Sequence, residues 1–349
     1  RHGCIYYHNK GEEPFGVSSE YPTFTFNENK VDGKYLMLVL RSNEFKKLLN
    51  TKASGISKAR VKVHEFLSIK IPLPPLPEQN RIVAQYNQKI QLAEQQEEEA
   101  ILLEDNLNNS MDVELGIEVI RNKTNYYGSF LKSVQYDTLK KWGIDLISNT
   151  KINYSKNYEV LKVAQICSVS SGGTPSRSRK DYYDGDIPWI KTGEVINDII
   201  YDTEEKITQE AIKNSSAKLY PKGSLIIAMY GQGKTRGRTA KLGVDATTNQ
   251  ACAVLYDMKN SLILTDYLWV YLQNEYDRLR ELASGNSQPN LNAEMIKNYP
   301  VVIPPIQEQQ IIVDRVFSKQ QQIRDLKFQA NKYREDALRN FEQEIFNSQ

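Results

Sequence analysis

The sequence has few of the residues that form disulfide frameworks and zinc sites. Its 349 residues include three His and three Cys, the latter at Cys4, Cys167 and Cys252. Because the Cys have no paired spacing, the sequence predicts neither a disulfide scaffold nor a metal site, and it favours a reducing cytosol. Long apolar runs are also missing: the longest, at 223–229, has the length of a strand, whereas a membrane-spanning helix needs about 20 residues. We therefore expect a cytoplasmic protein without a membrane segment.

Signatures of catalysis are missing as well. The sequence contains no Asn/Asp-Pro-Pro-Tyr/Phe motif of the kind that amino-methyltransferases use, and no Gly-x-Ser-x-Gly nucleophile elbow. Its three His residues have no evident carboxylate partners. These absences favour a binding protein over an enzyme, and no cofactor is expected.

One segment matches a nucleotide-binding pattern. Residues 228–235 fit the relaxed Walker A motif and follow an apolar strand, as a P-loop does. Residues 236–243, however, contain two Gly and no amphipathic period, so the helix whose N-terminus would hold a phosphate is not predicted. A P-loop nucleotidase is therefore a remote alternative. We interpret the segment as a Gly-rich hairpin tip that presents Tyr230, Gln232, Lys234, Arg236 and Arg238.

Charges of one sign are unevenly distributed, although 45 Lys and Arg nearly balance 43 Asp and Glu. Residues 211–244 contain seven basic residues and no acid, and residues 160–180 contain four basic residues and no acid. Residues 91–118 contain nine acids and no base. A polyanion would be attracted to the first two segments and repelled by the third. Charge alone leaves two interpretations open, a nucleic-acid surface or ordinary solvated loops and helices.

The sequence repeats itself at an offset of 230 residues. Ala-Ser-Gly at 53–55 recurs at 283–285, Pro-Pro at 74–75 recurs at 304–305, and Glu-Gln at 78–79 recurs at 308–309. Ten of the 31 positions from 53 to 83 are identical to their counterparts. This similarity indicates a tandem pseudo-repeat whose unit is too large for a solenoid.

A long amphipathic helix is predicted after each Pro-Pro. Pro is tolerated in the first helical turn, and Glu78 and Glu308 then lie where the helix dipole favours a carboxylate. Apolar residues recur at intervals of three and four, with a seven-residue step at Val316, Ile323, Ala330 and Ala337. The helices should be about 48 and 60 Å long. Both seams contain polar residues, at Glu97, Glu104, Lys319 and Asn340. We therefore expect the helices to pack on each other, antiparallel or nearly so.

Short β-rich runs lie between the predicted helices. The runs 161–169, 187–190, 224–229 and 251–256 favour strands, and residues 265–282 favour one helix. We expect an α+β fold in five segments: half of a first domain at 1–70, a first spacer helix region at 71–120, a linker at 121–158, a second domain at 159–300 and a second spacer helix at 301–349. The first copy is half as long as the second, so its front half is expected to be missing from this sequence.

The motifs of the second copy, taken together, resemble a known family. Ser-Gly-Gly-Thr-Pro-Ser at 171–176 leads to Tyr-Tyr at 182–183 and Ile-Pro-Trp-Ile at 187–190. The Gly-rich hairpin, Thr-Asn-Gln at 248–250, the Ala-Ser-Gly loop and the Pro-Pro-x-x-Glu-Gln helix entry follow in that order. In this combination they are similar to the target recognition domains of the specificity subunits of type I restriction-modification systems. The resemblance covers residues 161–349 and, in the first copy, about 35–95.

The resemblance implies a non-catalytic DNA-binding subunit. In that family, two β-rich target recognition domains each read half of a bipartite site in double-stranded DNA. Two conserved helices act as a spacer and dock two DNA methyltransferase (modification) subunits, in a complex that also holds restriction/translocase subunits. The C-terminal specificity portion of a single-chain restriction-methyltransferase is the alternative. The first copy departs from the pattern because its segment 22–26 lacks the Thr-Asn-Gln feature.

Candidate DNA-binding residues lie on exposed loops of the second domain. Base reading needs side chains that reach groove edges, chiefly those of Arg, Lys, Asn and Gln, while basic residues hold phosphates. Asn249 and Gln250 have an alternative role, because such amides are also satisfied inside turns and caps. Besides the hairpin residues named above, the candidates are Thr174, Ser176, Arg177, Arg179, Lys180, Asn249, Gln250, Gln288 and Asn290.

Overall fold

The structure of the chain is a computed structural model that describes residues 5–8, 13, 16–18, 21–52, 61–121, 150–154, 157–231, 233–283 and 290–346. It divides into two compact units. Unit 1 comprises Arg1–Glu104 and Gln321–Gln349, and unit 2 comprises Asp105–Gln320. Helices and strands are mixed, as the sequence predicts, and two long helices each contribute to both units.

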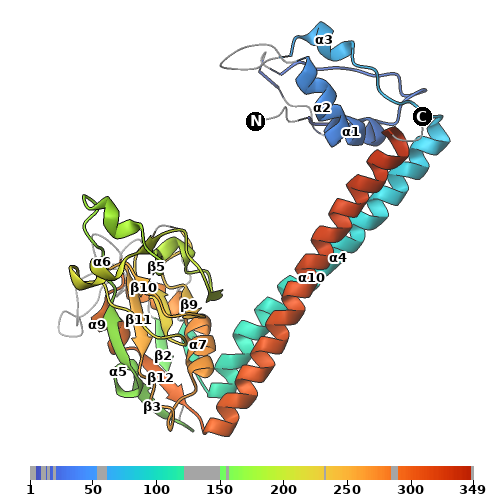
Figure 1. The fold of residues 1–349 in the computed structure, drawn as a ribbon. Coiled ribbons are helices and arrows are strands. Elements are labelled where there is room, and N and C mark those ends of the chain that lie inside the picture. The colour runs from blue at the N-terminus through green and yellow to red at the C-terminus, as the bar shows by residue number, and fades with distance from the viewer. Residues whose placement is uncertain are drawn as a thin grey trace, which may run out of the picture. The chain divides into compact units, whose positions relative to one another are not determined.

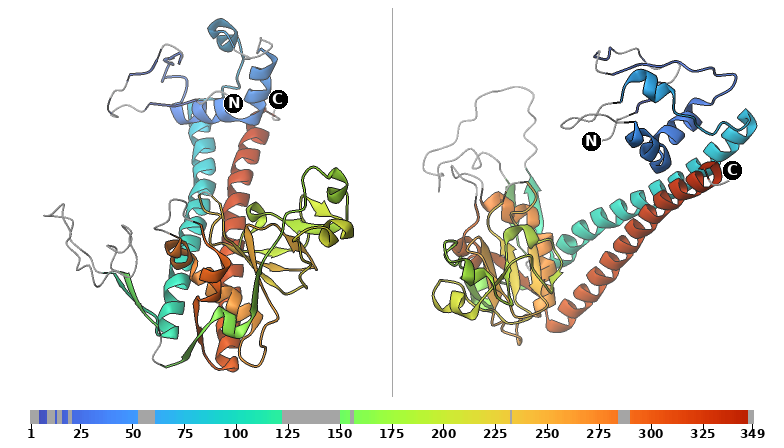
Figure 2. Two further views of the ribbon diagram at one scale, coloured as in Figure 1. Left: turned by 90° about the vertical axis from the view of Figure 1, so that its left-hand side faces the viewer. Right: turned by 45° about the horizontal axis from the view of Figure 1, so that its top comes forward.

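The two predicted spacer helices are α4, Leu76–Leu115, and α10, Ile306–Phe346, which run side by side (Figures 1 and 2). Their 40 and 41 residues correspond to about 60 and 62 Å. The expected length of the first helix, about 48 Å, was too short. The helix continues because Met111 and Leu115 extend the four-residue apolar step beyond Leu107, and both are buried in the core of unit 2.

Ion pairs between α4 and α10 fix an antiparallel register. They are Glu97–Arg334 and Glu104–Lys327 in unit 1, and Glu114–Arg315 in unit 2. Along the seam, small residues let the helices approach: Ala93, Ala100, Ala330 and Ala337 are all buried. The expected antiparallel packing is confirmed, and the acids that weaken the α4 seam are partners for bases of α10. Exposed pairs of this kind each contribute only about 0–1 kcal/mol, so they select the register more than they add stability.

The first copy of the repeat attaches its long helix through a buried glutamine. The Gln79 side chain is fully buried, and its Oε1 accepts a hydrogen bond from the Asp32 N–H at 2.8 Å. Its Nε2 donates to the carbonyls of Lys30 and Pro74, at 2.8 and 2.7 Å. Asp32 is the N-cap of α1, Gly33–Arg41. Gln79 therefore joins the start of α4 to the start of α1.

The second copy contains the same arrangement. Oε1 of the buried Gln309 accepts from the Leu264 N–H at 2.8 Å, and its Nε2 donates to the carbonyls of Leu262 and Pro304 at 2.9 and 2.8 Å. Leu264 is the N-cap of α7, Thr265–Asn274. Matching buried glutamines thus make matching bonds, and the pseudo-repeat read from the sequence is confirmed at the level of hydrogen bonds.

Helices are the only regular secondary structure among the described residues of unit 1. Besides parts of the long helices it contains α1, α2 (Asn43–Thr51) and α3 (Val63–Leu67). Its core joins α1 to both long helices through Tyr35, Leu38, Val39, Ile82, Val83, Phe341 and Ile345. The sheet that precedes α7 in the second copy has no counterpart among these described residues.

Unit 2 is built around a five-stranded sheet of order β4-β11-β8-β9-β6. Its strands are β4 (Ser168–Ser171), β11 (Cys252–Tyr256), β8 (Leu225–Ala228), β9 (Thr239–Leu242) and β6 (Ile199–Ile200). Three smaller sheets are β10 (Thr247–Thr248), β5 (Ile187–Ile190) and β7 (Lys206–Ile207); β12 (Pro300–Ile303) with β3 (Glu159–Lys162); and β1 (Glu118–Arg121) with β2 (Thr150–Asn153). Short helical segments are α6 (Gln209–Lys213), α9 (Ala293–Lys297), η3 (Lys180–Tyr183) and η4 (Thr192–Glu194).

Two elements differ from the sequence prediction. The run 161–169 is not one strand, because α5 (Val163–Ile166) separates β3 from β4. The helix expected over 265–282 is divided into α7 and α8 (Tyr276–Leu282). The division falls at Glu275, whose side chain is fully buried. Most of the predicted linker at 121–158 lies outside the described residues.

The break at Glu275 allows its carboxylate to join a buried polar network. Oε2 accepts a hydrogen bond from the Tyr299 hydroxyl at 2.5 Å, and Oε1 pairs with Arg278. Arg278 also pairs with Asp112 of α4, whose second oxygen accepts from Asn274 Nδ2 at 2.8 Å. One cation therefore serves two carboxylates, and the network joins α8 to the end of α4.

The stability of unit 2 should fall as pH rises from about 4.3, the ordinary value for Glu, toward 7. Burial raises the pKa of Glu275 to about 7, opposed by Arg278 and by the Tyr299 hydroxyl, while Asp112 acts in the same direction as burial. The nearby phenol of Tyr154 also has a raised pKa, about 12, and stays neutral in this range. The folded state then holds a proton that the unfolded chain has lost, so stability declines until Glu275 ionises.

Urea unfolding of the wild type and Glu275→Gln at pH 5 and pH 8 measures this effect. At 1.36 kcal/mol per pKa unit, the variant should gain about 3 kcal/mol relative to the wild type over that range. If the free energy of unfolding changes with pH in the same way for both proteins, Glu275 does not cause the pH dependence of stability.

Candidate nucleic-acid interface

Described segments that carry or adjoin candidate DNA-binding residues leave the same end of the five-stranded sheet. Strand β11 is antiparallel to β4 and β8, with Ala253 opposite Ser171 and Cys252 opposite Ala228. The segments after β4 (172–180), between β8 and β9 (229–231 and 233–238) and before β11 (249–251) therefore emerge together. A hydrogen bond from the Leu291 N–H to the Met229 carbonyl, 3.1 Å, brings residues 290–292 to this end as well. We call these four segments the sheet-end loops.

The Gly-Gly pair seats the first sheet-end loop against the Thr-Asn-Gln segment. The Gly172 N–H donates to the Cys252 carbonyl at 3.1 Å, and the Gly173 N–H donates to the Thr248 carbonyl at 2.9 Å. A Cβ on Gly172 would lie 2.3 Å from the Thr248 carbonyl oxygen and 2.4 Å from that of Asn249. Only glycine permits this approach, so two motifs distant in sequence form one structural element.

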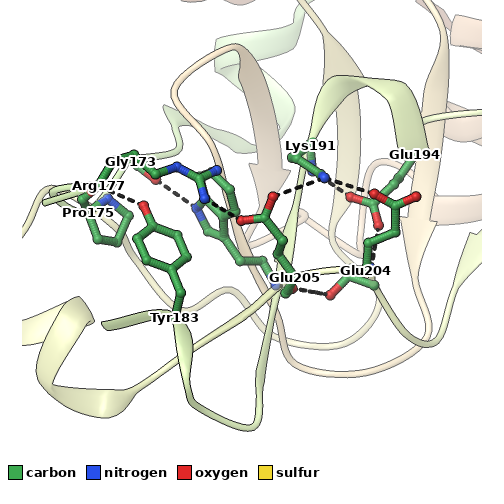
Figure 3. Close-up of polar contacts among 10 residues, drawn as sticks. Gly173, Pro175, Arg177, Tyr183, Lys191, Glu194, Glu204 and Glu205 are labelled. Atoms are coloured by element: carbon green, nitrogen blue, oxygen red, sulfur yellow. Dashed lines mark hydrogen bonds and ion pairs between the residues drawn. The ribbon is translucent and has the colours of Figure 1, made fainter. Parts of the chain in front are cut away.

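Aromatic side chains of the Tyr-Tyr and Ile-Pro-Trp motifs hold the same loop. The Trp189 Nε1–H donates to the Gly173 carbonyl at 3.0 Å, and the Tyr183 hydroxyl donates to the Pro175 carbonyl at 2.7 Å (Figure 3). Trp189 is itself buried in strand β5. These residues therefore position the loop backbone that carries Arg177.

Arg177 lies on an aromatic surface next to a carboxylate. Its guanidinium is 4.2 Å from the ring centroid of Tyr183 and 4.8 Å from that of Trp189. Nη1 donates to Glu205 Oε2 at 2.5 Å, and this bond lowers the pKa of Glu205 (Figure 3). About half of the Arg177 side chain remains exposed. The predicted Arg177 is thus held in a fixed orientation with one side open to solvent.

Acidic residues missed by the sequence analysis extend from this arginine to Lys191. Lys191 Nζ lies 2.9 Å from Glu204 and 3.1 Å from Glu205. Glu194 accepts from the Lys191 N–H at 2.8 Å and from the Glu204 N–H at 3.0 Å. Three carboxylates therefore meet two cations, an arrangement suited to polar contacts with base edges more than to a cluster of phosphates.

The remaining residues of the first loop differ in their exposure. Arg179 donates hydrogen bonds to both carboxylate oxygens of Asp181, from Nε to Oδ1 at 2.9 Å and from Nη2 to Oδ2 at 2.5 Å, and its guanidinium lies 4.4 Å from the Tyr182 ring centroid. Its charge is thus largely balanced within the domain. Lys180 and Ser176 are exposed, Ser176 lies 2.8 Å from the Ser178 hydroxyl, and Thr174 is half-buried.

The segment between β8 and β9 is a hairpin connection, as predicted, and it leads into a strand instead of a helix. Gly231, Gly233 and Gly237 have positive φ, at 135, 64 and 86°. Tyr230 and Lys234 are exposed, whereas Arg236 and Arg238 are half-buried. Burial and the neighbouring charge of Arg280 lower the pKa of Arg236. Gln232 lies outside the described residues. The geometry lacks the helix N-terminus of a P-loop.

The amide candidates fall into two groups. Asn249 has a structural role, because its Oδ1 accepts from the Ala251 N–H at 3.1 Å and its N–H donates to the Ile190 carbonyl at 2.9 Å. This is the turn alternative left open by the sequence. Gln250 is exposed and Asn290 is half-buried. Gln288 lies outside the described residues.

Two negative findings apply to the described part of the chain. No group of three or more His, Cys, Asp or Glu side chains within it could hold a metal ion. None of its helices has the length and apolar character that a membrane span requires.

Comparisons with known proteins point to one family. The family described as "Type I restriction modification DNA specificity domain" matches residues 2–103 and 155–329, well over half of the chain. The MjaIX specificity subunit of a type I restriction enzyme from Methanocaldococcus jannaschii is 29% identical over 162 residues, covering 45% of this chain and 36% of that protein. The MjaVIII specificity subunit from the same organism is 24% identical over 315 residues, covering 87% of this chain and 67% of that protein.

A solved structure supports the fold. A chain from a study of complex assembly and conformational transition of the type I R-M system has a TM-score of 0.60 and 19% identity, covering 92% of this chain and 71% of that chain. The match to the MjaIX subunit, like that to the Escherichia coli EcoR124I/EcoR124II specificity subunit, spans only about a third of the relative's length (36%). With matches in both copies of its repeat, this chain belongs to the type I restriction modification DNA specificity domain family.

Proposed function

We propose that the chain is a sequence-specific DNA-recognition subunit of a type I restriction-modification complex, and that the sheet-end loops read one half of a bipartite DNA site. The observation that carries this proposal is the emergence of the four sheet-end loops from one end of the five-stranded sheet. In this proposal residues 159–300 form the second target recognition domain, residues 1–70 belong to the first, and α4 and α10 form the spacer.

Two kinds of contact are supported at this end of the sheet. The hairpin carries Lys234, Arg236 and Arg238, and no carboxylate occurs between residues 211 and 244, so its field favours phosphates. On the first loop Arg177 pairs with the carboxylate of Glu205, and this combination suits donor and acceptor patterns on base edges. We therefore assign phosphate contacts to the hairpin and base contacts to the first loop.

The proposed partners follow from the family. The relatives are named as specificity subunits of type I restriction enzymes. We propose that two methyltransferase subunits dock on the paired helices and that restriction subunits complete the complex. The chain itself is proposed to be non-catalytic, in keeping with its lack of catalytic motifs.

Binding of the chain to a 30-base-pair duplex of random sequence should be weak and should fall steeply with salt. Each phosphate contact contributes about 0.9 to the slope of log K against log salt concentration, so Lys234→Gln should reduce that slope by about 1. Fluorescence anisotropy between 50 and 200 mM salt measures both quantities. Lys259→Gln is the matched control, because this exposed lysine follows β11 at the opposite end of the sheet. Salt-independent binding, or equal effects of the two variants, would contradict the proposal.

A further inference from the structure

The short helix α8 lies against the backbone of the proposed DNA-binding hairpin. The Tyr276 hydroxyl donates to the Lys234 carbonyl at 2.8 Å, and Arg280 Nη1 donates to the Arg236 carbonyl at 2.9 Å. Both acceptors are main-chain oxygens within the hairpin tip. The two bonds therefore fix the course of the tip backbone, while the side chain of Lys234 remains exposed.

The contact lies at a glycine whose left-handed backbone conformation disfavours a side chain. Gly237 is buried with a φ of 86°, and a Cβ there would lie 3.1 Å from Arg280 Cγ and 3.3 Å from the Tyr276 carbonyl oxygen. Arg280 Nη1 also donates to the Tyr276 hydroxyl at 3.2 Å, and its guanidinium lies 5.2 Å from the Tyr276 ring centroid. The two side chains thus support each other against the tip.

The other side of α8 is anchored in the body of unit 2. Arg278 pairs with Glu275 and with Asp112 of α4, and Leu279 is fully buried in the core. A helix held in this way cannot follow a moving loop. Contacts with α8 therefore restrict the hairpin more than contacts with another loop would.

We propose that α8 positions the hairpin tip, with Tyr276 and Arg280 as the positioning residues that place Lys234, Arg236 and Arg238 for contact with DNA. The DNA part of this proposal rests on the proposed function, whereas the restraint of the tip does not. Arg280 adds a positive charge beside Arg236. The same residue thus holds the backbone and strengthens attraction for an anion.

Amide hydrogen exchange on the DNA-free chain tests the restraint. The reporters are the Gly237 and Arg238 N–H groups, which donate to the carbonyls of Ala228 and Thr235 at 2.9 and 3.1 Å. Tyr276→Phe removes only the hydroxyl, and loss of one hydrogen bond should accelerate exchange about fivefold. Arg280→Met should do the same, and Arg280→Lys, which keeps a donor, should restore part of the protection. Tyr201→Phe, at an exposed tyrosine after β6, is the control.

Binding to the random duplex then separates positioning from charge. The Tyr276→Phe variant should bind the duplex about threefold to tenfold more weakly than the wild type because its hairpin tip is less restrained. Its salt slope should stay at the wild-type value because the substitution changes no charge. Unchanged amide exchange would overturn the restraint, and faster exchange with unchanged affinity would overturn the positioning role. If amide exchange is faster in the variant but the wild type does not bind DNA, the restraint of the tip is supported and the proposed function is refuted.

Discussion

Replacement of Arg278 by Met should lower the free energy of unfolding of unit 2 by about 3–5 kcal/mol, the range observed when one partner of a buried ion pair is removed. Arg278 is the cation shared by Glu275 and Asp112, and Glu275 is fully buried. Met fills a similar volume but leaves two carboxylates near each other in a poorly solvated place. Denaturant unfolding at pH 8, where Glu275 is ionised, should show the full loss.

Two comparisons make this result specific. In a Glu275→Gln background the same Arg278→Met change should cost much less, because only Asp112 then loses its cation. Arg324→Met is the surface control: Arg324 is exposed on α10 and donates to Gln321, and its loss should stay within about 0.5 kcal/mol. If Arg278→Met lowers the free energy of unfolding equally in both backgrounds, the ion pair with Glu275 does not cause the loss.

The sequence predicts those parts of the fold that depend on local signals. The Pro-Pro entries, the seven-residue step and the repeat at 230 residues are periodic, and they correctly indicate two long antiparallel helices and a duplicated helix attachment. The length of α4 was underestimated because Met111 and Leu115 lie in a polar segment, where their burial depends on the core of unit 2. The break at Glu275 was missed for a related reason. Glu favours helices, and its network partner Asp112 is 163 positions away.

In the candidate site, too, features with a local sequence signal were predicted, whereas contacts that depend on the tertiary fold were not. The residue types and loops were found from the sequence because base and phosphate contacts require Arg, Lys, Asn and Gln on exposed segments. The side-chain partners were not found. Glu205 is 28 positions from Arg177, and Arg280 is 44 positions from Arg236, so these pairs are created only by the tertiary fold. Arg280 in particular resembles any surface residue of a helix.

Replacement of Gly172 by Ala should disturb the sheet-end loops more than any other single-methyl change considered. The added Cβ would lie 2.1 Å from Thr248 Oγ1, 2.3 Å from the Thr248 carbonyl oxygen and 2.4 Å from the Asn249 carbonyl oxygen. Two of these atoms are backbone, so the loop must move away from the Thr-Asn-Gln segment. Overpacking of this kind costs about 1–3 kcal/mol, and we expect the upper end because the bond from Gly173 to Thr248 is strained at the same time.

Thermal unfolding and duplex binding of Gly172→Ala, compared with Gly193→Ala, test this prediction. Gly193 is exposed in η4, and a Cβ there meets nothing within 4 Å, so its replacement should change neither property. Gly172→Ala should lower the melting temperature and, because Arg177 follows on the displaced loop, should also weaken binding per folded molecule. If the two variants have the same melting temperature, close packing at Gly172 does not hold the first sheet-end loop in place. If only stability falls, the Arg177 loop does not contact DNA, and the base contacts must be sought on the other sheet-end loops.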